Sequence, residues 1–161
     1  KRRRKTEILQ HMDEIDQIDA RILHALESDG RQTNAALAER VGLSASACLR
    51  RVQALERAGI IAGYRARIDR TKLGRSFTSF VTVGLSSHTR EAQRQFEAAM
   101  AAAPEVIECH NITGTVEYML RIEVADLSAY KRFHAEGLGG LPQVSSITSY
   151  VVMASPKDLR G

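Results

Sequence analysis

One short stretch of the chain carries polar and basic side chains at the spacing of a single helix face. Ser46, Arg50 and Arg57 follow one another at steps of four and seven residues, and Gln53 lies between them. Because an α-helix turns once every 3.6 residues, these four side chains would point in the same direction. Hydroxyl, amide and guanidinium groups on one face can hydrogen-bond to base edges and to phosphate oxygens. The pattern therefore predicts a surface that could meet a nucleic acid.

Two short helices joined by a tight turn would position that face, and residues 34–59 carry the expected signals. Thr33 or Asn34 can cap the first helix, and Ser44 can cap the second. Gly42 occupies the position where a helix most often ends in a left-handed residue. The apolar face that we predict for the second helix consists of Cys48, Leu49, Val52 and Leu55. This pattern is typical of a helix-turn-helix, whose second helix enters the major groove of DNA.

The charge distribution favours DNA binding over a merely solvated helix face. The chain has 161 residues and a net charge of +4. Residues 1–75 hold 16 basic and 10 acidic residues, whereas residues 76–161 hold 7 basic and 9 acidic residues. We infer that only the first half meets a polyanion. The DNA-binding residues that we predict are Ser44, Ser46, Ala47, Arg50, Arg51 and Arg57, with Arg50 as the reader of a base.

Several other features narrow the class of protein. The chain has no run of about 18 apolar residues and no secretory signal, so we expect a cytoplasmic protein without a membrane span. Cys48 and Cys109 lie far apart without metal-ligand spacing, which suits a reducing compartment. Cys109 and His110 are adjacent but lack a third ligand or base, so we expect neither a metal nor a cofactor. The basic cluster KRRRK belongs to a segment, residues 1–14, that we predict as a disordered tail or extension.

The remaining sequence predicts the domain organisation. A first helix over residues 16–28 completes a helix-turn-helix domain of residues 15–62. Alternating Tyr64, Ala66 and Ile68 predict a short strand within a linker of residues 63–75. Residues 76–161 predict a domain with the order β-α-β-β-α-β, the split unit of a ferredoxin-like fold. Its predicted strands are residues 77–85, 105–112, 116–124 and 144–153, and its predicted helices cover residues 90–103 and the segment after Asp126.

Five segments of the chain, in order, together carry a resemblance to a known family. They read IDARILHALESDGR, LAERVGLSASACLRRVQALERAGII, ECHNITGTVEY, DLSAYKRFH and SITSYVVM, within residues 15–153. They resemble the Lrp/AsnC (leucine-responsive, feast/famine) transcription regulators. The resemblance implies a winged-type helix-turn-helix domain joined to a βαββαβ effector domain, with dimerisation through the sheet and frequent assembly to octamers. It also implies a small effector, commonly an amino acid, bound between effector domains.

The resemblance further implies an effector loop that commonly reads Gly-Asp-aromatic-Asp-Tyr. Here the loop reads Gly114-Thr115-Val116-Glu117-Tyr118. Glu117 keeps a carboxylate that could accept an ammonium group, and N–H groups near Gly114 could bind a carboxylate. Thr115 departs from the family pattern, which leaves the identity of the ligand open. We predict an effector site at Gly114, Thr115, Glu117 and Tyr118; the alternative is an ordinary hairpin turn in which Gly114 supplies a positive φ.

Two further alternatives stand beside an effector-responsive regulator. Siroheme decarboxylases resemble the same two-domain architecture, and His110 or His134 would carry such chemistry here. The basic reading face argues against that enzyme, because it has no need for a groove-binding helix. The second alternative is an architectural DNA-binding protein without a ligand. We predict a regulator that is not an enzyme, that binds double-stranded DNA, and that forms a dimer or an octamer of four dimers.

Overall fold

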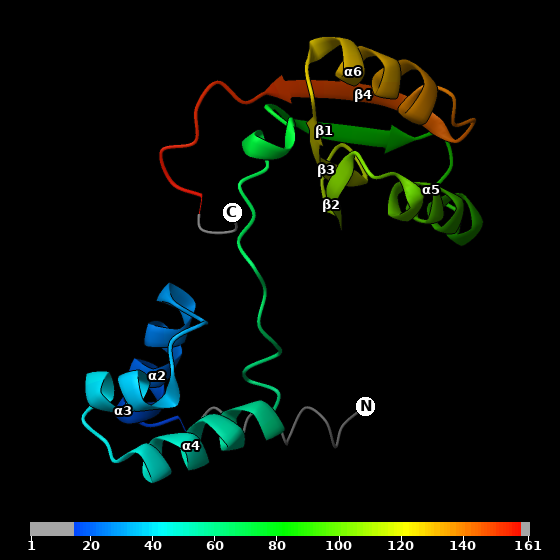
Figure 1. Cartoon of the computed structure of the whole chain (residues 1–161). Coiled ribbons are helices and arrows are strands. Elements are labelled where there is room, and N and C mark those ends of the chain that lie inside the picture. The colour runs from blue at the N-terminus through cyan, green and yellow to red at the C-terminus, as the bar shows by residue number, and fades with distance from the viewer. Residues whose placement is uncertain (1–14, 159–161) are drawn as a thin grey trace. The chain divides into compact units, whose positions relative to one another are not determined.

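The computed structural model describes residues 15–158 and divides the chain into two units (Figure 1). The first unit ends at Ala66 and the second begins at Arg67, inside the segment 63–75 that we interpret as a linker. The basic cluster of residues 1–14 lies outside the described residues. In the described part of the chain, no helix is long and apolar enough to cross a membrane.

The first unit consists of three helices around one small core. Their bounds are α2 Gln17–Ser28, α3 Asn34–Val41 and α4 Ala45–Arg57. The side chains of Asp16, Thr33 and Ser44 accept hydrogen bonds from the first free N–H groups of these helices. Gly42 ends α3 in the left-handed conformation, with φ of 74°. The predicted helix-turn-helix is therefore present, and its core consists of Ile22, Ala25, Leu37, Ala38, Val41, Cys48 and Leu55.

The prediction that Leu49 belongs to the apolar face of α4 is wrong. Its side chain is 45% exposed and takes no part in the core cluster. Cys48 is fully buried, and the next residue along an α-helix points about 100° away. Leu49 therefore projects from the flank of α4 toward the polar face.

The predicted strand over Tyr64, Ala66 and Ile68 is also wrong. The segment is irregular in the structure, and all three side chains are exposed. A strand needs a neighbouring strand for its backbone hydrogen bonds, and a unit of three helices offers none. The Tyr64 hydroxyl instead donates a hydrogen bond to Oε1 of Glu56, 2.9 Å away, which ties the segment to α4.

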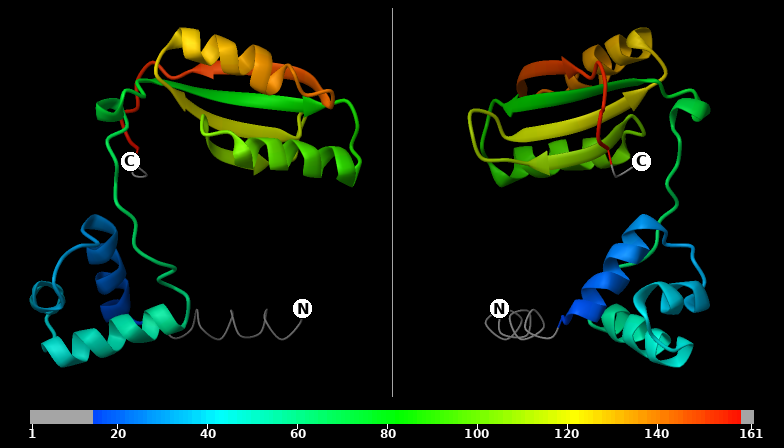
Figure 2. Two further views of the ribbon diagram at one scale, coloured as in Figure 1. Left: turned by 45° about the vertical axis from the view of Figure 1, so that its right-hand side comes forward. Right: turned by 90° about the vertical axis from the view of Figure 1, so that its left-hand side faces the viewer.

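The second unit is a four-stranded antiparallel sheet with its helices on one face (Figure 2). The strand order is β2-β3-β1-β4. The strands are β1 Phe77–Leu85, β2 Val106–Asn111, β3 Tyr118–Val124 and β4 Val144–Val151. The helical segments are η1 Thr71–Leu73, α5 Arg90–Ala102, α6 Leu127–Arg132 and the π-helical η2 Phe133–Leu138. The order of strands and main helices confirms the predicted βαββαβ fold.

The pleat of β3 gives the sheet two faces with different chemistry. Tyr118, Leu120 and Ile122 face the helices and are fully buried with Phe96 of α5. The intervening side chains of β3 face the other side, which no helix covers (Figure 2). We call this side the open face; it carries Met119, Arg121 and Glu123 of β3 and Tyr150 of β4.

The open face contains a buried ion cluster. The Arg121 guanidinium lies 2.8 Å from Glu123 and 2.9 Å from Asp158, and the Arg70 side chain reaches Glu123 at 3.2 Å. Burial lowers the pKa of Arg121, but the carboxylates of Glu123 and Asp158 outweigh this effect and raise it. The buried charges of Arg121 and Glu123 are therefore paired with each other, as buried charges must be.

Candidate nucleic-acid interface and effector loop

The start of α4 is fixed by hydrogen bonds that the turn residues provide. Ala47 N–H donates to Oγ of Ser44 at 3.3 Å, the usual geometry of an N-terminal cap. The side-chain amide of Asn34, at the start of α3, donates to the carbonyl of Ala45 at 2.8 Å. The first turn of α4 is thus held against the preceding helix.

The outer face of α4 is polar, basic and exposed. Ser46, Arg50, Gln53 and Arg57 are all exposed. Among the described residues, Arg50 and Arg57 have no ion-pair partner. Their guanidinium groups are therefore available to an external anion or base edge. Arg57 lies seven residues beyond Arg50, about 10 Å further along the helix axis, so the two side chains can contact different parts of one ligand.

The predicted DNA-binding residue Arg51 is engaged within the protein. Its guanidinium contacts Oδ2 of Asp16 at 2.8 Å and Oδ1 of Asp19 at 2.9 Å. These hydrogen bonds to Asp19 and Asp16 raise the pKa of Arg51. These two contacts join α4 to α2 and to its cap residue Asp16, and they hold α4 in a fixed orientation relative to α2. Of the other predicted residues, Ser44 serves as the cap and Ala47 is half-buried beside it.

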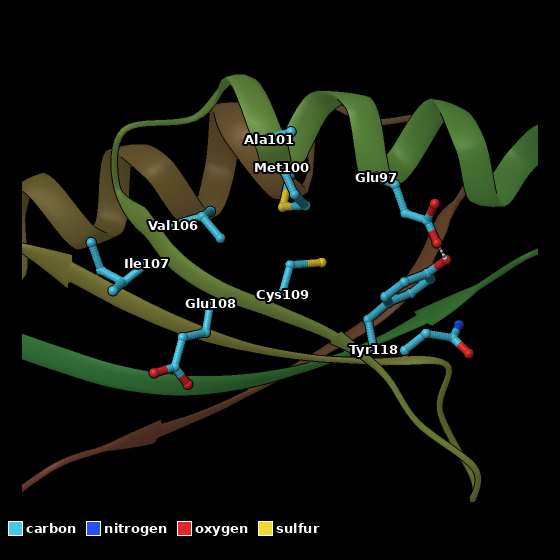
Figure 3. A pocket seen from close by; sticks show the side chains of 9 residues that line it. Glu97, Met100, Ala101, Val106, Ile107, Glu108, Cys109 and Tyr118 are labelled. Carbon is cyan, nitrogen blue, oxygen red and sulfur yellow. Dashed lines mark hydrogen bonds between the residues drawn. The ribbon is translucent and has the colours of Figure 1, made fainter. Parts of the chain in front are cut away.

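The predicted effector residues lie on both sides of the sheet. The Tyr118 ring faces α5, with its centroid 4.6 Å from that of Phe96, and its hydroxyl donates to Oε1 of Glu97 at 2.8 Å (Figure 3). Burial raises the pKa of Tyr118 to about 12, and the hydrogen bond to Glu97 adds to the effect. Tyr118 therefore anchors the hairpin between β2 and β3 to α5.

A pocket of about 330 Å³ lies beside Tyr118, between α5 and the edge strand β2 (Figure 3). Its apolar wall includes Met100 and Val106, and its polar lining includes Glu97 and Asn111. The Cys109 thiol also lines it, and burial, followed by the charge of Glu97, raises the pKa of that thiol. A raised pKa makes this thiol less reactive as a nucleophile.

Glu117 faces away from that pocket and is already hydrogen-bonded. Its Oε2 accepts the N–H of Leu85 at 2.7 Å, and its Oε1 lies 3.0 Å from Nδ1 of His88. Gly114 has φ of 155° and, like Thr115, is exposed in the loop before Glu117. An ammonium group could reach this carboxylate by replacing the exposed His88 ring. Sequence reasoning missed both His88 and Glu97, because neither belongs to the loop motif and only the fold brings them to it.

The two histidines weighed for enzyme chemistry lie on separate elements. Nε2 of His110, on β2, lies 3.3 Å from Oε2 of Glu108. The ring of His134, in η2, packs edge-on against Tyr130 with centroids 6.0 Å apart. Within residues 15–158, no group of three or more His, Cys, Asp or Glu side chains could hold a metal ion.

Comparisons with known proteins match both units. The AsnC-type helix-turn-helix domain matches residues 15–56, and the Lrp/AsnC ligand binding domain matches residues 78–161. The leucine-responsive regulatory protein of Salmonella typhimurium is 41% identical over 144 residues, which cover 89% of this chain and 88% of that protein. The leucine-responsive regulatory protein of Escherichia coli K12 is 40% identical over 144 residues, which also cover 89% of this chain and 88% of that protein.

Solved structures show the same relationship. A transcriptional regulator from Neisseria meningitidis, in complex with L-Met, has a TM-score of 0.85 and 34% identity, covering 89% of this chain and 92% of that one. An AsnC family transcriptional regulator from Agrobacterium tumefaciens has a TM-score of 0.83 and 33% identity, covering 89% and 93%.

Replacing Arg51 tests its assignment as a structural residue. We expect Arg51→Ala to lower the melting temperature, measured by circular dichroism, because Asp19 would lose its partner. Arg50→Ala, one residue away and unpaired, should leave it unchanged. The pKa of Asp16 is held below its ordinary 3.8, first by the N–H of Asp19 and also by Arg51. The ionised Asp16 carboxylate therefore stabilises the folded protein above pH 3.8, and this contribution is lost as the pH falls through the lowered pKa of Asp16. Equal melting temperatures for the two variants would contradict the assignment.

Tyrosinate absorbance tests the environment of Tyr118. The difference in titration between the wild type and Tyr118→Phe should show a midpoint at about pH 12. The contribution of the protonated Tyr118 hydroxyl to the free energy of unfolding should be complete below pH 10, and it should disappear as the pH rises through about 12. Glu97→Gln should lower the midpoint without returning it to 10, since burial is the larger cause. A midpoint near 10 in the folded wild type would show that the ring is solvated.

Proposed function

Because the chain belongs to the Lrp/AsnC family of transcription regulators, we propose that α4 reads specific DNA sites and that an amino acid bound to the second unit alters this reading. The observation that carries the first part is the exposed outer face of α4, on which Arg50 and Arg57 lack partners among the described residues. The second part is supported by the match to a ligand-binding domain and by a related regulator solved with L-Met.

On α4 we assign different roles to the basic residues. Arg50 lies beyond the short side chains of the first turn, and its forked guanidinium can donate two hydrogen bonds to O6 and N7 of guanine. Ser44 and Ser46 are exposed at the start of the helix and can donate to phosphates or base edges. Arg57 and the exposed Arg65 supply affinity for phosphates that does not depend on sequence. Arg51 contributes indirectly, by orienting the helix.

We propose that the open face of the sheet mediates a homodimer in the cytoplasm, with octamers as a further stage. Met119 and Tyr150 are exposed on this face, 38% and 57% respectively, and no helix covers them. A two-fold partner that presents the same face would bury both side chains. Two helix-turn-helix units could then read half-sites about 34 Å apart, one turn of DNA.

For the effector we propose a site at Gly114, Thr115 and Glu117, with Tyr118 holding the hairpin in place. The ammonium group of the amino acid would bind Glu117 in place of His88, and loop N–H groups would bind its carboxylate. Such a ligand would favour one arrangement of the paired reading units, with a coupling free energy of about 1–3 kcal/mol.

We propose no enzymatic activity. The relatives reported above are named as regulators, and His110 and His134 lie on different elements with structural partners. A regulator also accounts for the basic outer face of α4, which catalysis would leave unused.

Arg50→Ala tests base reading. We expect it to weaken binding to a selected site by about 1–3 kcal/mol, the value of a bidentate arginine–guanine pair, and to remove the preference at one base position. Arg57→Ala is the matched control: it should weaken all sequences alike and reduce the dependence of log K on log salt by about one. Fluorescence anisotropy on base-substituted duplexes measures both. An unchanged preference profile in Arg50→Ala would refute the assignment.

Thermal shift with the twenty amino acids tests the effector site. At least one, with L-Met a first choice, should raise the melting temperature at millimolar concentration, because a ligand at 100 times its Kd stabilises by about 2.7 kcal/mol. Glu117→Gln should abolish the shift, since an amide still accepts the Leu85 N–H but loses the charge. His88→Ala should keep or enlarge the shift by removing the competitor. A shift that survives in Glu117→Gln would place the ligand elsewhere.

A further inference from the structure

Leu49 is an apolar side chain at the edge of a polar and basic surface. It is 45% exposed and lies outside the core that Cys48 and Leu55 enter from the same helix. In the described part of the first unit, the other large exposed apolar side chains are Ile15, next to the start of α2, and Tyr64, whose hydroxyl binds Glu56. Of these three side chains, only Leu49 lies on α4. Packing in the core does not account for a leucine at this position.

The neighbours of Leu49 leave it prominent. The residues of the first turn of α4 are Ala45, Ser46 and Ala47, all with short side chains. Leu49 follows Ala45 by four residues and Arg50 follows Ser46 by four, so both longer side chains stand one turn behind short ones. A helix that enters a groove with its N-terminal half would therefore bring the methyl groups of Leu49 and the guanidinium of Arg50 to the base edges together.

We propose that Leu49 is a specificity residue that contacts the 5-methyl group of a thymine in the major groove, beside the base that Arg50 reads. Among the four bases of DNA only thymine presents a methyl group in this groove, and apolar side chains recognise it by contact. The proposal rests on the proposed function, because it needs α4 to enter DNA. The basic character of Arg50 and Arg57 makes DNA the occupant of this face rather than an apolar protein surface.

Deoxyuridine provides the test, because it pairs as thymidine does but lacks the methyl group. Sites are first selected from random duplexes with the full wild-type chain. Each thymine of the selected site is then replaced in turn by uracil, and the Kd is measured for the wild type and for Leu49→Ala. We expect one thymine in each half-site at which uracil weakens the wild type by about fourfold, the value of burying one methyl-sized group. At that position the same change should leave Leu49→Ala unaffected.

The controls separate this contact from loss of folding. Alanine is a better helix former than leucine, and Leu49 leaves no core cavity, so Leu49→Ala should keep the wild-type melting temperature. Leu127→Ala is the matched control, since Leu127 is 63% exposed on α6 of the other unit. It should bind thymine and uracil duplexes as the wild type does.

Each other result overturns the proposal in a distinguishable way. If sites are selected but no thymine shows a loss that disappears in Leu49→Ala, the methyl contact is wrong while sequence-specific DNA binding stands. If Leu49→Ala changes the oligomeric state rather than the uracil response, Leu49 belongs to a protein interface. If the wild type enriches no sequence at all, the proposed function fails and this contact fails with it.

Discussion

The anchoring of α4 on one side is the constraint on which its exposed polar face depends. On that side Cys48 and Leu55 pack into the core. Arg51 lies on the same side and forms ion pairs with Asp16 and Asp19. Because these contacts fix the rotation of the helix about its axis, they also decide which residues point outward. Arg51 makes ion pairs within the protein, whereas Arg50, the residue before it, is exposed on the outer face. The two arginines do different work because they lie about 100° apart.

The same kind of division organises the second unit, through the pleat of a strand rather than the turn of a helix. Neighbouring residues of a strand point to opposite faces. Tyr118 therefore enters the helix side and binds Glu97, whereas Glu117 enters the other side and meets His88. The hairpin is held from both sides, so a ligand that changes the contacts of Glu117 acts on a rigid element.

Periodicity explains what the sequence could reveal and where it could not. Strict alternation in β3 and the capped turns around Gly42 predicted the sheet, the helix-turn-helix and their order. The prediction for Leu49 is wrong because it relied on the apolar character of leucine. Leu49 lies about 100° around the helix from the buried Cys48, which places it outside the core. Arg51 shows the converse: it lies three residues after Cys48 and four before Leu55, a spacing that places it on the buried side. His88 and Glu97 could not be found, because only the tertiary fold brings them to the loop.

The occupied state of Glu117 bears on how strong an effector response can be. Its carboxylate already has a backbone N–H and an imidazole as partners, so in the proposed site an incoming ammonium group would replace one charge-assisted contact with another. The net binding free energy is the difference between the new ammonium contact and the lost His88 contact, so it is smaller than the free energy of either contact alone. A regulator that must release its ligand when the metabolite becomes scarce needs such a weak site. In the proposed site, the contact of Glu117 with His88 would therefore weaken effector binding, and it also holds the loop before β3 in place.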